Sequence, residues 1–129
     1  MNLTLLAGDF AICQLAPGDA GPPWWRIPGA LSLRIEVPGE TTVLCPAHLP
    51  PPEVRSDGPW RCFELQGPLP FEMVGVLHGI LGVLAAEEIS ILAYSSFDTD
   101  YVLVPAGRVA QSRAALEMAG YGVVEQADR

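Results

Sequence analysis

Oxygen-bearing side chains are concentrated in a short turn at residues 95–100, between apolar runs at 91–94 and 101–104. The acceptors are Ser95, Ser96, Asp98, Thr99 and Asp100. β-branched and aromatic residues in two arms around such a turn predict a β-hairpin. The side chains at its tip can accept hydrogen bonds from a cationic group. The same residue types also form ordinary turns and bond their own backbone, and this alternative stays open.

A second chemical feature is the loop that starts at Gly67 and leads to a helix predicted from Phe71. Glycine has no Cβ and leaves its N–H unobstructed, and a helix start presents free N–H groups with a partial positive charge. Such a place binds a carboxylate, although Gly67-Pro68 is also typical of a plain turn. The loop and the hairpin tip together offer partners for an anion and a cation.

The remaining reactive residues form no recognisable site. His48 and His78 have no neighbours at metal-ligand spacing, which favours exposed or packing histidines. Cys13, Cys45 and Cys62 lie in or beside strand-like runs without a Cys-x-x-Cys pair, which predicts buried reduced thiols. No serine elbow, phosphate loop or pair of catalytic carboxylates is present. We therefore expect no enzymatic activity, no metal and no cofactor.

The composition predicts a folded, acidic protein. The chain has 129 residues, 50% hydrophobic residues and a net charge of −8, and it contains no lysine. Phosphate backbones and anionic lipids repel such a surface, so we expect neither nucleic acid nor membrane as a partner. The N-terminus has no basic region of a signal peptide, and reduced cysteines suit a cytoplasmic protein.

The second half of the chain predicts the order strand, helix, strand, strand, helix, strand. Alternating side chains predict a strand at residues 60–66, and apolar residues at helical spacing predict a helix at 71–86. The hairpin follows, then a helix from Pro105 to Gly120 and a strand at 121–124. This is the order of a βαββαβ unit.

The long helix also carries small residues in one stripe. They are Gly75, Gly79, Gly82 and Ala86. Each glycine costs a helix up to about 1 kcal/mol relative to alanine. The stripe therefore indicates close packing by another helix or another subunit, or else drift in an Ala/Gly-rich composition.

The first half predicts a reduced version of the same order. Its strands are predicted at residues 3–6, 10–15, 31–37 and 41–45. Single helical turns near 24–26 and 52–55 would replace the two helices. We therefore predict an α+β chain of two tandem units, residues 1–59 and 60–129, the first degenerate with short helices.

Several segments resemble a known family. They are the strand ending at Gly67, the helix from Phe71, the passage Leu84-Ala85-x-x-x-Ile89-Ser90-Ile91, and Ser95-Ser96-Phe97-Asp98-Thr99-Asp100-Tyr101-Val102-Leu103-Val104. Residues 60–116 resemble an ACT domain, a small ferredoxin-like (βαββαβ) regulatory fold that binds amino acids. The last segment resembles the Ser-Thr-Tyr-x-Thr-Asp-(Phe/Tyr)-Ile-Leu-Val pattern of the ACT-like subfamily that includes the cytosolic arginine sensor of the TOR pathway and small bacterial proteins.

The resemblance implies a ligand site where two ACT units meet. The implied loop residues are Gly67, Pro68, Leu69, Pro70 and Phe71. The implied residues of the second strand and turn are Tyr94, Ser95, Ser96, Phe97, Asp98, Thr99 and Asp100. Many ACT domains have an acidic residue before the loop glycine, where this chain has Gln66. An amide accepts a hydrogen bond from an ammonium group without charge assistance.

Two hypotheses follow from the resemblance and the residues. The first is a non-enzymatic regulatory protein that binds a small molecule, an amino acid, as a homodimer or higher homo-oligomer. Asp98 and Asp100 would favour a cationic ligand side chain, such as that of arginine or lysine. The second is an ACT-type interaction module that binds no ligand, which Gln66 and the proline-filled loop favour.

Overall fold

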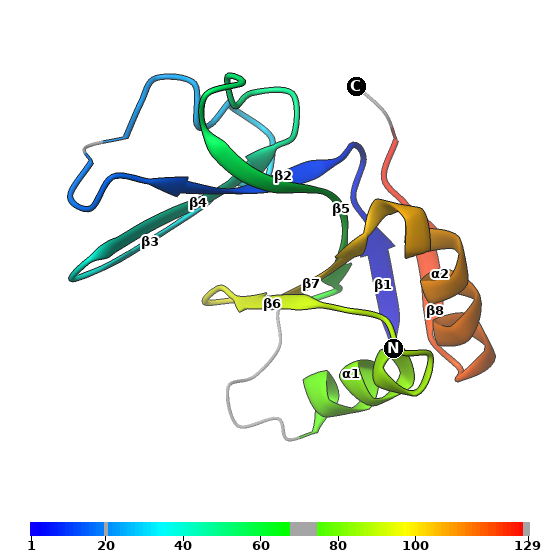
Figure 1. Ribbon diagram of the computed structural model, residues 1–129. Helices are drawn as coiled ribbons and strands as arrows, with labels where there is room; N and C mark the ends of the chain where they lie inside the picture. The colour runs from blue at the N-terminus through cyan, green and yellow to red at the C-terminus, as the bar shows by residue number, and fades with distance from the viewer. Residues whose placement is uncertain (20, 68–74, 128–129) are drawn as a thin grey trace. The chain divides into compact units, whose positions relative to one another are not determined.

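The computed structural model describes residues 1–19, 21–67 and 75–127 (Figure 1). The chain divides into two compact units. The C-terminal unit comprises Met1–Ala7 and Arg61–Arg129, and the N-terminal unit comprises Gly8–Trp60.

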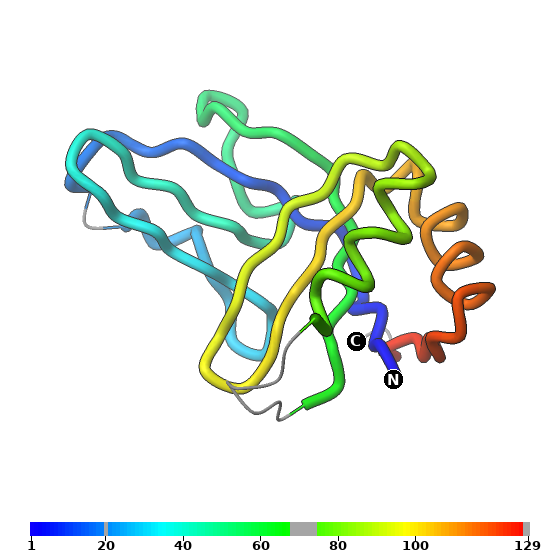
Figure 2. Tube along the Cα trace, turned by 90° about the horizontal axis from the view of Figure 1, so that it is seen from below, coloured from blue at the N-terminus to red at the C-terminus, as the bar shows by residue number. Residues whose placement is uncertain are grey.

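The C-terminal unit contains a five-strand sheet with two α-helices. Its elements are β1 (Asn2–Leu5), the end of β5 (Arg55–Leu65), α1 (Val76–Ala86), β6 (Leu92–Ser95), β7 (Asp100–Pro105), the 3₁₀ turn η1 (Ala106–Arg108), α2 (Val109–Met118) and β8 (Gly122–Glu125). The strand order is β8-β1-β5-β7-β6. Elements β5 to β8 follow the predicted βαββαβ order, and Figure 2 shows the β6–β7 hairpin as two adjacent strands.

Strand β1 is an addition to that order, because it lies between the first and the last strand of the unit. It pairs antiparallel with β5, Leu3 opposite Leu65, and parallel with β8, Leu3 opposite Val123. Leu3 and Leu5 are buried on the same face of the strand, as the alternation of side chains requires. The first residues of the chain therefore complete the sheet of the C-terminal unit.

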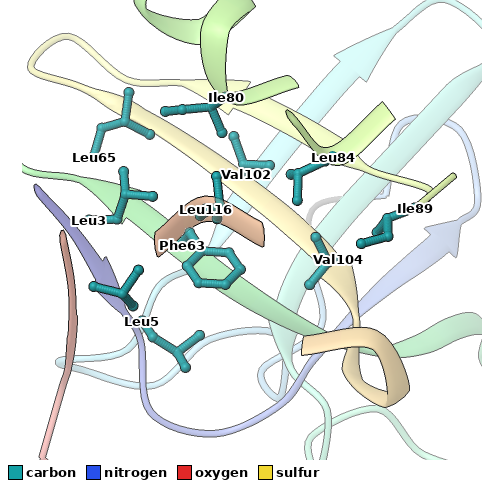
Figure 3. Packing of buried hydrophobic residues seen from close by; sticks show 11 residues of the cluster. Leu3, Leu5, Phe63, Leu65, Ile80, Leu84, Ile89, Val102, Val104 and Leu116 are labelled. Carbon is teal, nitrogen blue, oxygen red and sulfur yellow. The ribbon is translucent and has the colours of Figure 1, made fainter. Parts of the chain in front are cut away.

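The core of this unit lies between the sheet and the two helices (Figure 3). Its buried members are Leu3, Leu5, Phe63, Leu65, Ile80, Leu84, Ile89, Val102, Val104, Leu116 and Val123. Ile80 and Leu84 are four residues apart on α1, so they lie on one face of the helix and point into the core. Burial of these side chains removes their apolar surface from water, at about 25 cal/mol per Å².

The N-terminal unit is built of strands in the order β3-β4-β2-β5. Its elements are β2 (Phe10–Leu15), β3 (Leu33–Val37), β4 (Glu40–Pro46) and the first residues of β5. The β2–β4, β2–β5 and β3–β4 pairs are all antiparallel. One face buries Ala11, Cys13, Leu15, Val43 and Cys45, against which Trp24 and Trp25 pack.

The short helices predicted for the first half are present only as single hydrogen-bonded turns. The described residues of the N-terminal unit contain no helix. Near the two predicted sites, single turns close with Trp25 N–H donating to Pro22 O at 3.3 Å and Val54 N–H donating to Pro51 O at 3.1 Å. The prolines there have no backbone N–H, so a longer ladder of helical hydrogen bonds cannot form.

One element boundary differs from the prediction. Strand β5 begins at Arg55 rather than at residue 60, because the β2–β5 register shifts between Phe10 and Ile12, where a bulge accommodates Pro59. The structure describes helix α1 from Val76, with Gly75 as its N-cap residue at φ 82°. The predicted helix start at Phe71 lies outside the described residues.

Candidate functional site

The turn of the β6–β7 hairpin is closed by its own residues. Ser96 N–H donates to Thr99 O at 2.9 Å, and the Ser96 hydroxyl both donates to Thr99 O at 3.2 Å and accepts from Thr99 N–H at 3.3 Å. Ser96 and Thr99 thus act as turn-forming residues in the structure. A turn closed three times between the same two residues holds the tip in one shape.

A side-chain hydrogen bond ties this tip to the end of β5. The Thr99 hydroxyl donates to the carbonyl oxygen of Leu65 at 2.6 Å, in a partly buried position. Asn2 and Gln66 form a hydrogen-bonded pair of the β1–β5 ladder. Because such pairs alternate along an antiparallel ladder, the Leu65 carbonyl points away from β1, toward the side on which β7 lies. On that side the Leu65 carbonyl accepts the hydrogen bond from the Thr99 hydroxyl.

The same bond relates the two segments in which we predicted a ligand site. Gly67 follows Leu65 by two residues, so their Cα atoms lie within about 7 Å of each other. The structure therefore brings the hairpin tip close to the beginning of the predicted loop. The other predicted loop residues, Pro68, Leu69, Pro70 and Phe71, lie outside the described residues.

The acceptors at the tip are not equivalent. Asp100 accepts a 2.5 Å hydrogen bond from the Ser95 hydroxyl through Oδ1, and the two residues are directly opposite each other across the hairpin. One oxygen of the Asp100 carboxylate therefore stabilises the hairpin itself. Asp98 and Phe97 are exposed at the tip, and Phe97 is 80% exposed.

The predicted residues of the hairpin lie on both faces of the sheet. Ser95 and Asp100 share the face of Val102, whose side chain belongs to the core under the helices. Tyr94 and Tyr101 are opposite each other on the other face. A ligand that contacts Ser95 from one side therefore cannot contact the ring of Tyr94 from the same side.

Tyr101 and Glu64 form a polar pair on that second face, which sequence reasoning missed. Burial raises the pKa of the Tyr101 hydroxyl above its ordinary value, and the charge of Glu64 and a hydrogen bond with it raise the pKa further. A hydrogen bond with Ser96 acts in the opposite direction on the same pKa. The alternation of residues 60–66 places Glu64 on the face opposite Phe63 and Leu65. The position of Glu64 near the end of this strand was the sequence signal from which a polar contact on that face could have been predicted.

Gln66 is directed toward β1. Its side-chain Nε2 donates to Thr4 Oγ1 at 3.4 Å and its backbone N–H donates to Asn2 O at 3.1 Å. The amide that we predicted as a substitute for the acidic residue of the family is thus bonded to a neighbouring strand.

Among the described residues, the start of α1 at Val76 presents backbone N–H groups of the kind expected at an anion site. The helix has no side-chain hydrogen bond at its N-cap residue, Gly75, and no acidic residue in its first turn. Its first N–H groups and the positive end of the helix dipole are therefore not neutralised by a carboxylate of that turn.

The stripe of small residues on α1 has a partial explanation. A Cβ atom on Gly79 would lie 2.7 Å from the hydroxyl oxygen of Tyr121, so this glycine admits the tyrosine side chain. Nothing lies within 4 Å of a Cβ built on Gly82. Close packing thus accounts for Gly79 and not for Gly82.

The described residues show neither a metal site nor a membrane span. Residues 1–19, 21–67 and 75–127 contain no group of three or more His, Cys, Asp or Glu side chains that could hold a metal ion. In the same ranges, no helix is long and apolar enough to cross a membrane.

Comparison with known proteins shows what the segment around this site is similar to. Residues 55–118 match the model of the ACT domain. The match runs from the start of β5 to the end of α2, so it includes the hairpin tip, Leu65 and the beginning of α1. No curated protein sequence matches the chain significantly.

Solved structures with the same fold are known. A protein from Agrobacterium tumefaciens is 28% identical with a TM-score of 0.89, over 99% of this chain and 95% of that one. A Vibrio cholerae protein, described as a possible transport protein, is 19% identical with a TM-score of 0.75, over 91% and 88% of the two chains. The regulatory subunit of aspartate kinase from Thermus thermophilus is 12% identical with a TM-score of 0.59, over 88% and 93%.

Proposed function

We propose that this protein is a non-enzymatic ACT-type regulatory protein that binds an amino acid. The observation that carries the proposal is the Thr99–Leu65 hydrogen bond, which holds the oxygen-rich hairpin tip at the end of β5, directly before Gly67. The segment that contains both residues matches the ACT domain.

The chemistry of a free amino acid suits these groups. Its carboxylate would bind the N–H groups of the 67–71 loop or of the start of α1, where the helix dipole favours negative charge. Its cationic groups would bind the acceptors of the hairpin tip, from Tyr94 to Asp100. Because Asp98 is exposed and Asp100 bonds Ser95 through one oxygen, we assign the preference for an arginine or lysine side chain mainly to Asp98.

The same proposal includes the wider organisation of the chain. We take the two halves, residues 1–59 and 60–129, as tandem ACT-type units, and the protein as a cytoplasmic homodimer or higher homo-oligomer. The strand orders support the tandem arrangement. If the strands of each half are numbered along the chain and β1 is left out, the order β3-β4-β2-β5 and the order β6-β7-β5-β8 both place the second, third, first and fourth strand side by side. We further propose that the protein is related to the ACT-like subfamily that includes the cytosolic arginine sensor of the TOR pathway.

A melting-temperature screen over the twenty amino acids tests the ligand. A ligand at about 100 times its dissociation constant adds roughly 2.7 kcal/mol to the stability of the folded state. We expect arginine or lysine to raise the melting temperature, and Asp98→Asn to reduce that increase. Glu53→Gln is the matched control, because it removes the same charge at an exposed residue of the other unit.

One observation favours the second candidate function, an interaction module without a ligand. Gln66 is bonded to Thr4, so the residue before the loop glycine offers its donor to β1. If none of the twenty amino acids changes the melting temperature, the binding proposal is wrong and the interaction module replaces it. Stabilisation by neutral or acidic amino acids alone would retain binding but contradict the role of Asp98.

A further inference from the structure

Strand β3 forms the outer edge of the sheet in the N-terminal unit (Figure 1). It pairs with β4 from Leu33 to Val37, and no other described strand pairs with it. Ile35 and Val37 are 41% and 49% exposed. The edge therefore presents backbone hydrogen-bonding groups beside exposed apolar side chains, which is a surface to which another strand can add.

Several protections that edge strands use are absent from β3, although Arg34 and Glu36 place charges on one of its faces. The chain contains no lysine, and Pro38 follows only after the last residue of the strand. The β3–β4 register continues from Leu33 to Val37 without a shift, so no bulge interrupts it. Edge strands without such features readily pair with another strand.

The sequence of β3 identifies the partner, because it is complementary to itself. Leu33-Arg34-Ile35-Glu36-Val37 alternates apolar and charged residues, with opposite charges on the two sides of Ile35. We propose that β3 pairs antiparallel with β3 of a second copy of this chain, around a two-fold axis at Ile35. In this register Arg34 is opposite Glu36 of the second copy, and Leu33 is opposite its Val37.

The positions of the charges support this register. Arg34 Nη2 lies 2.6 Å from Glu36 Oε1 of the same strand, and the two side chains are 19% and 56% exposed. The guanidinium also donates to the carbonyl of Asp19, which fixes its position. In the dimer each guanidinium faces its own Glu36 and that of the second copy. Opposite charges across a strand pair stabilise it, and like charges destabilise it.

Charge also explains why the register matters. Two copies with a net charge of −8 each repel one another. The alternating charges of β3 provide an edge at which this repulsion is replaced by attraction. A register shifted by two residues, with Ile35 opposite Val37, would place Glu36 opposite Glu36 of the second copy, which is a destabilising like-charge pair.

Substitution of Ile35 tests the interface. Ile35→Lys places two positive charges next to each other at the two-fold axis, and its exposed position leaves the fold intact. We expect sedimentation velocity over a concentration series to show a dimer for the unmodified protein. The dissociation constant should rise about tenfold or more in the variant. Val124→Lys is the matched control, since Val124 is a 54% exposed β-branched residue on β8.

A charge exchange gives an independent test. Glu36→Arg makes the edge doubly positive and Arg34→Glu makes it doubly negative, so each variant alone should be mainly monomeric. A mixture of the two should form a heterodimer, because opposite charges then face each other in the same register. Circular dichroism establishes that each variant is folded. If Arg34→Glu fails to fold, Ile35→Lys and Glu36→Arg decide the question.

Three results would overturn the inference. They are a monomer at all concentrations, a dimer that Val124→Lys but not Ile35→Lys dissociates, and a mixture of charge variants no more dimeric than its components. The inference specifies the surface for the homodimer of the proposed function. Ligand binding is scored separately, by repeating the melting-temperature screen on Ile35→Lys, so the two proposals can fail independently.

Discussion

Replacement of Thr99 by valine removes the hydroxyl group that connects the hairpin tip to β5. The hydroxyl donates to Leu65 O at 2.6 Å, in a partly buried position. Valine has nearly the same shape, so packing is preserved and the carbonyl loses this donor. A hydrogen bond is worth about 1 kcal/mol net, and a desolvated group without a partner costs about 1–3 kcal/mol. Because this position is only partly buried, we expect Thr99→Val to lower the free energy of unfolding by about 1.5 kcal/mol.

Urea denaturation followed by circular dichroism measures this loss. Thr99→Ser keeps the hydroxyl and should retain most of the stability. Thr42→Val is the matched control, because the Thr42 hydroxyl donates to Glu40 at 3.2 Å in an exposed position, where little should be lost. If Thr99→Val and Thr42→Val have the same midpoint as the unmodified protein, the bond does not hold the tip. The geometric basis of the proposed site would then be refuted.

Two further predictions concern packing and burial. Gly82→Ala should raise the free energy of unfolding by up to about 1 kcal/mol, since nothing lies near the new methyl group. Gly79→Ala should gain less or destabilise, because Tyr121 must move; equal effects of the two in thermal melts would contradict this. Burial and the neighbouring Cys13 raise the pKa of Cys45 to about 12. The buried neutral thiol of Cys45 therefore contributes fully to the stability of the folded state below the unfolded thiol pKa of about 8.5. This contribution is lost as the pH rises toward 12. Native Cys45 should react with a thiol reagent at pH 8 far more slowly than the urea-unfolded chain, and equal rates would contradict the burial.

The local patterns of the sequence predicted most of the second half. Alternation identified the strand that became β3 and the end of β5, and an apolar run identified β2. The Ser/Asp/Thr turn between two apolar runs identified the β6–β7 hairpin. These elements depend on side-chain period and turn chemistry, both of which are local. The C-terminal end of α2 could also be predicted from local sequence, because Gly120 adopts the left-handed φ of 101° that is typical of a residue after a helix end.

Long-range pairing was the part that sequence reasoning could not supply. Residues 3–6 show only a short, mostly apolar run, and nothing in that run specifies pairing with residues 63–65 and 122–125. We predicted a boundary between residues 59 and 60, whereas a bulge opposite Phe10 lets β5 continue through Pro59. A Cβ on Gly58 would lie 2.9 Å from the Phe10 carbonyl, so the close approach of the two strands there requires glycine.

The candidate site shows the same division between local and long-range information. Residue types at positions 95–100 were sufficient to suggest acceptors, because an acceptor is recognised from its chemistry alone. Whether an acceptor is available to a ligand depends on its neighbours. Asp100 is bonded to Ser95 across the hairpin, and Ser96 is bonded to Thr99 within the turn. Asp98, by contrast, is exposed at the tip. This difference between the two carboxylates is what makes Asp98→Asn the informative variant in the ligand screen.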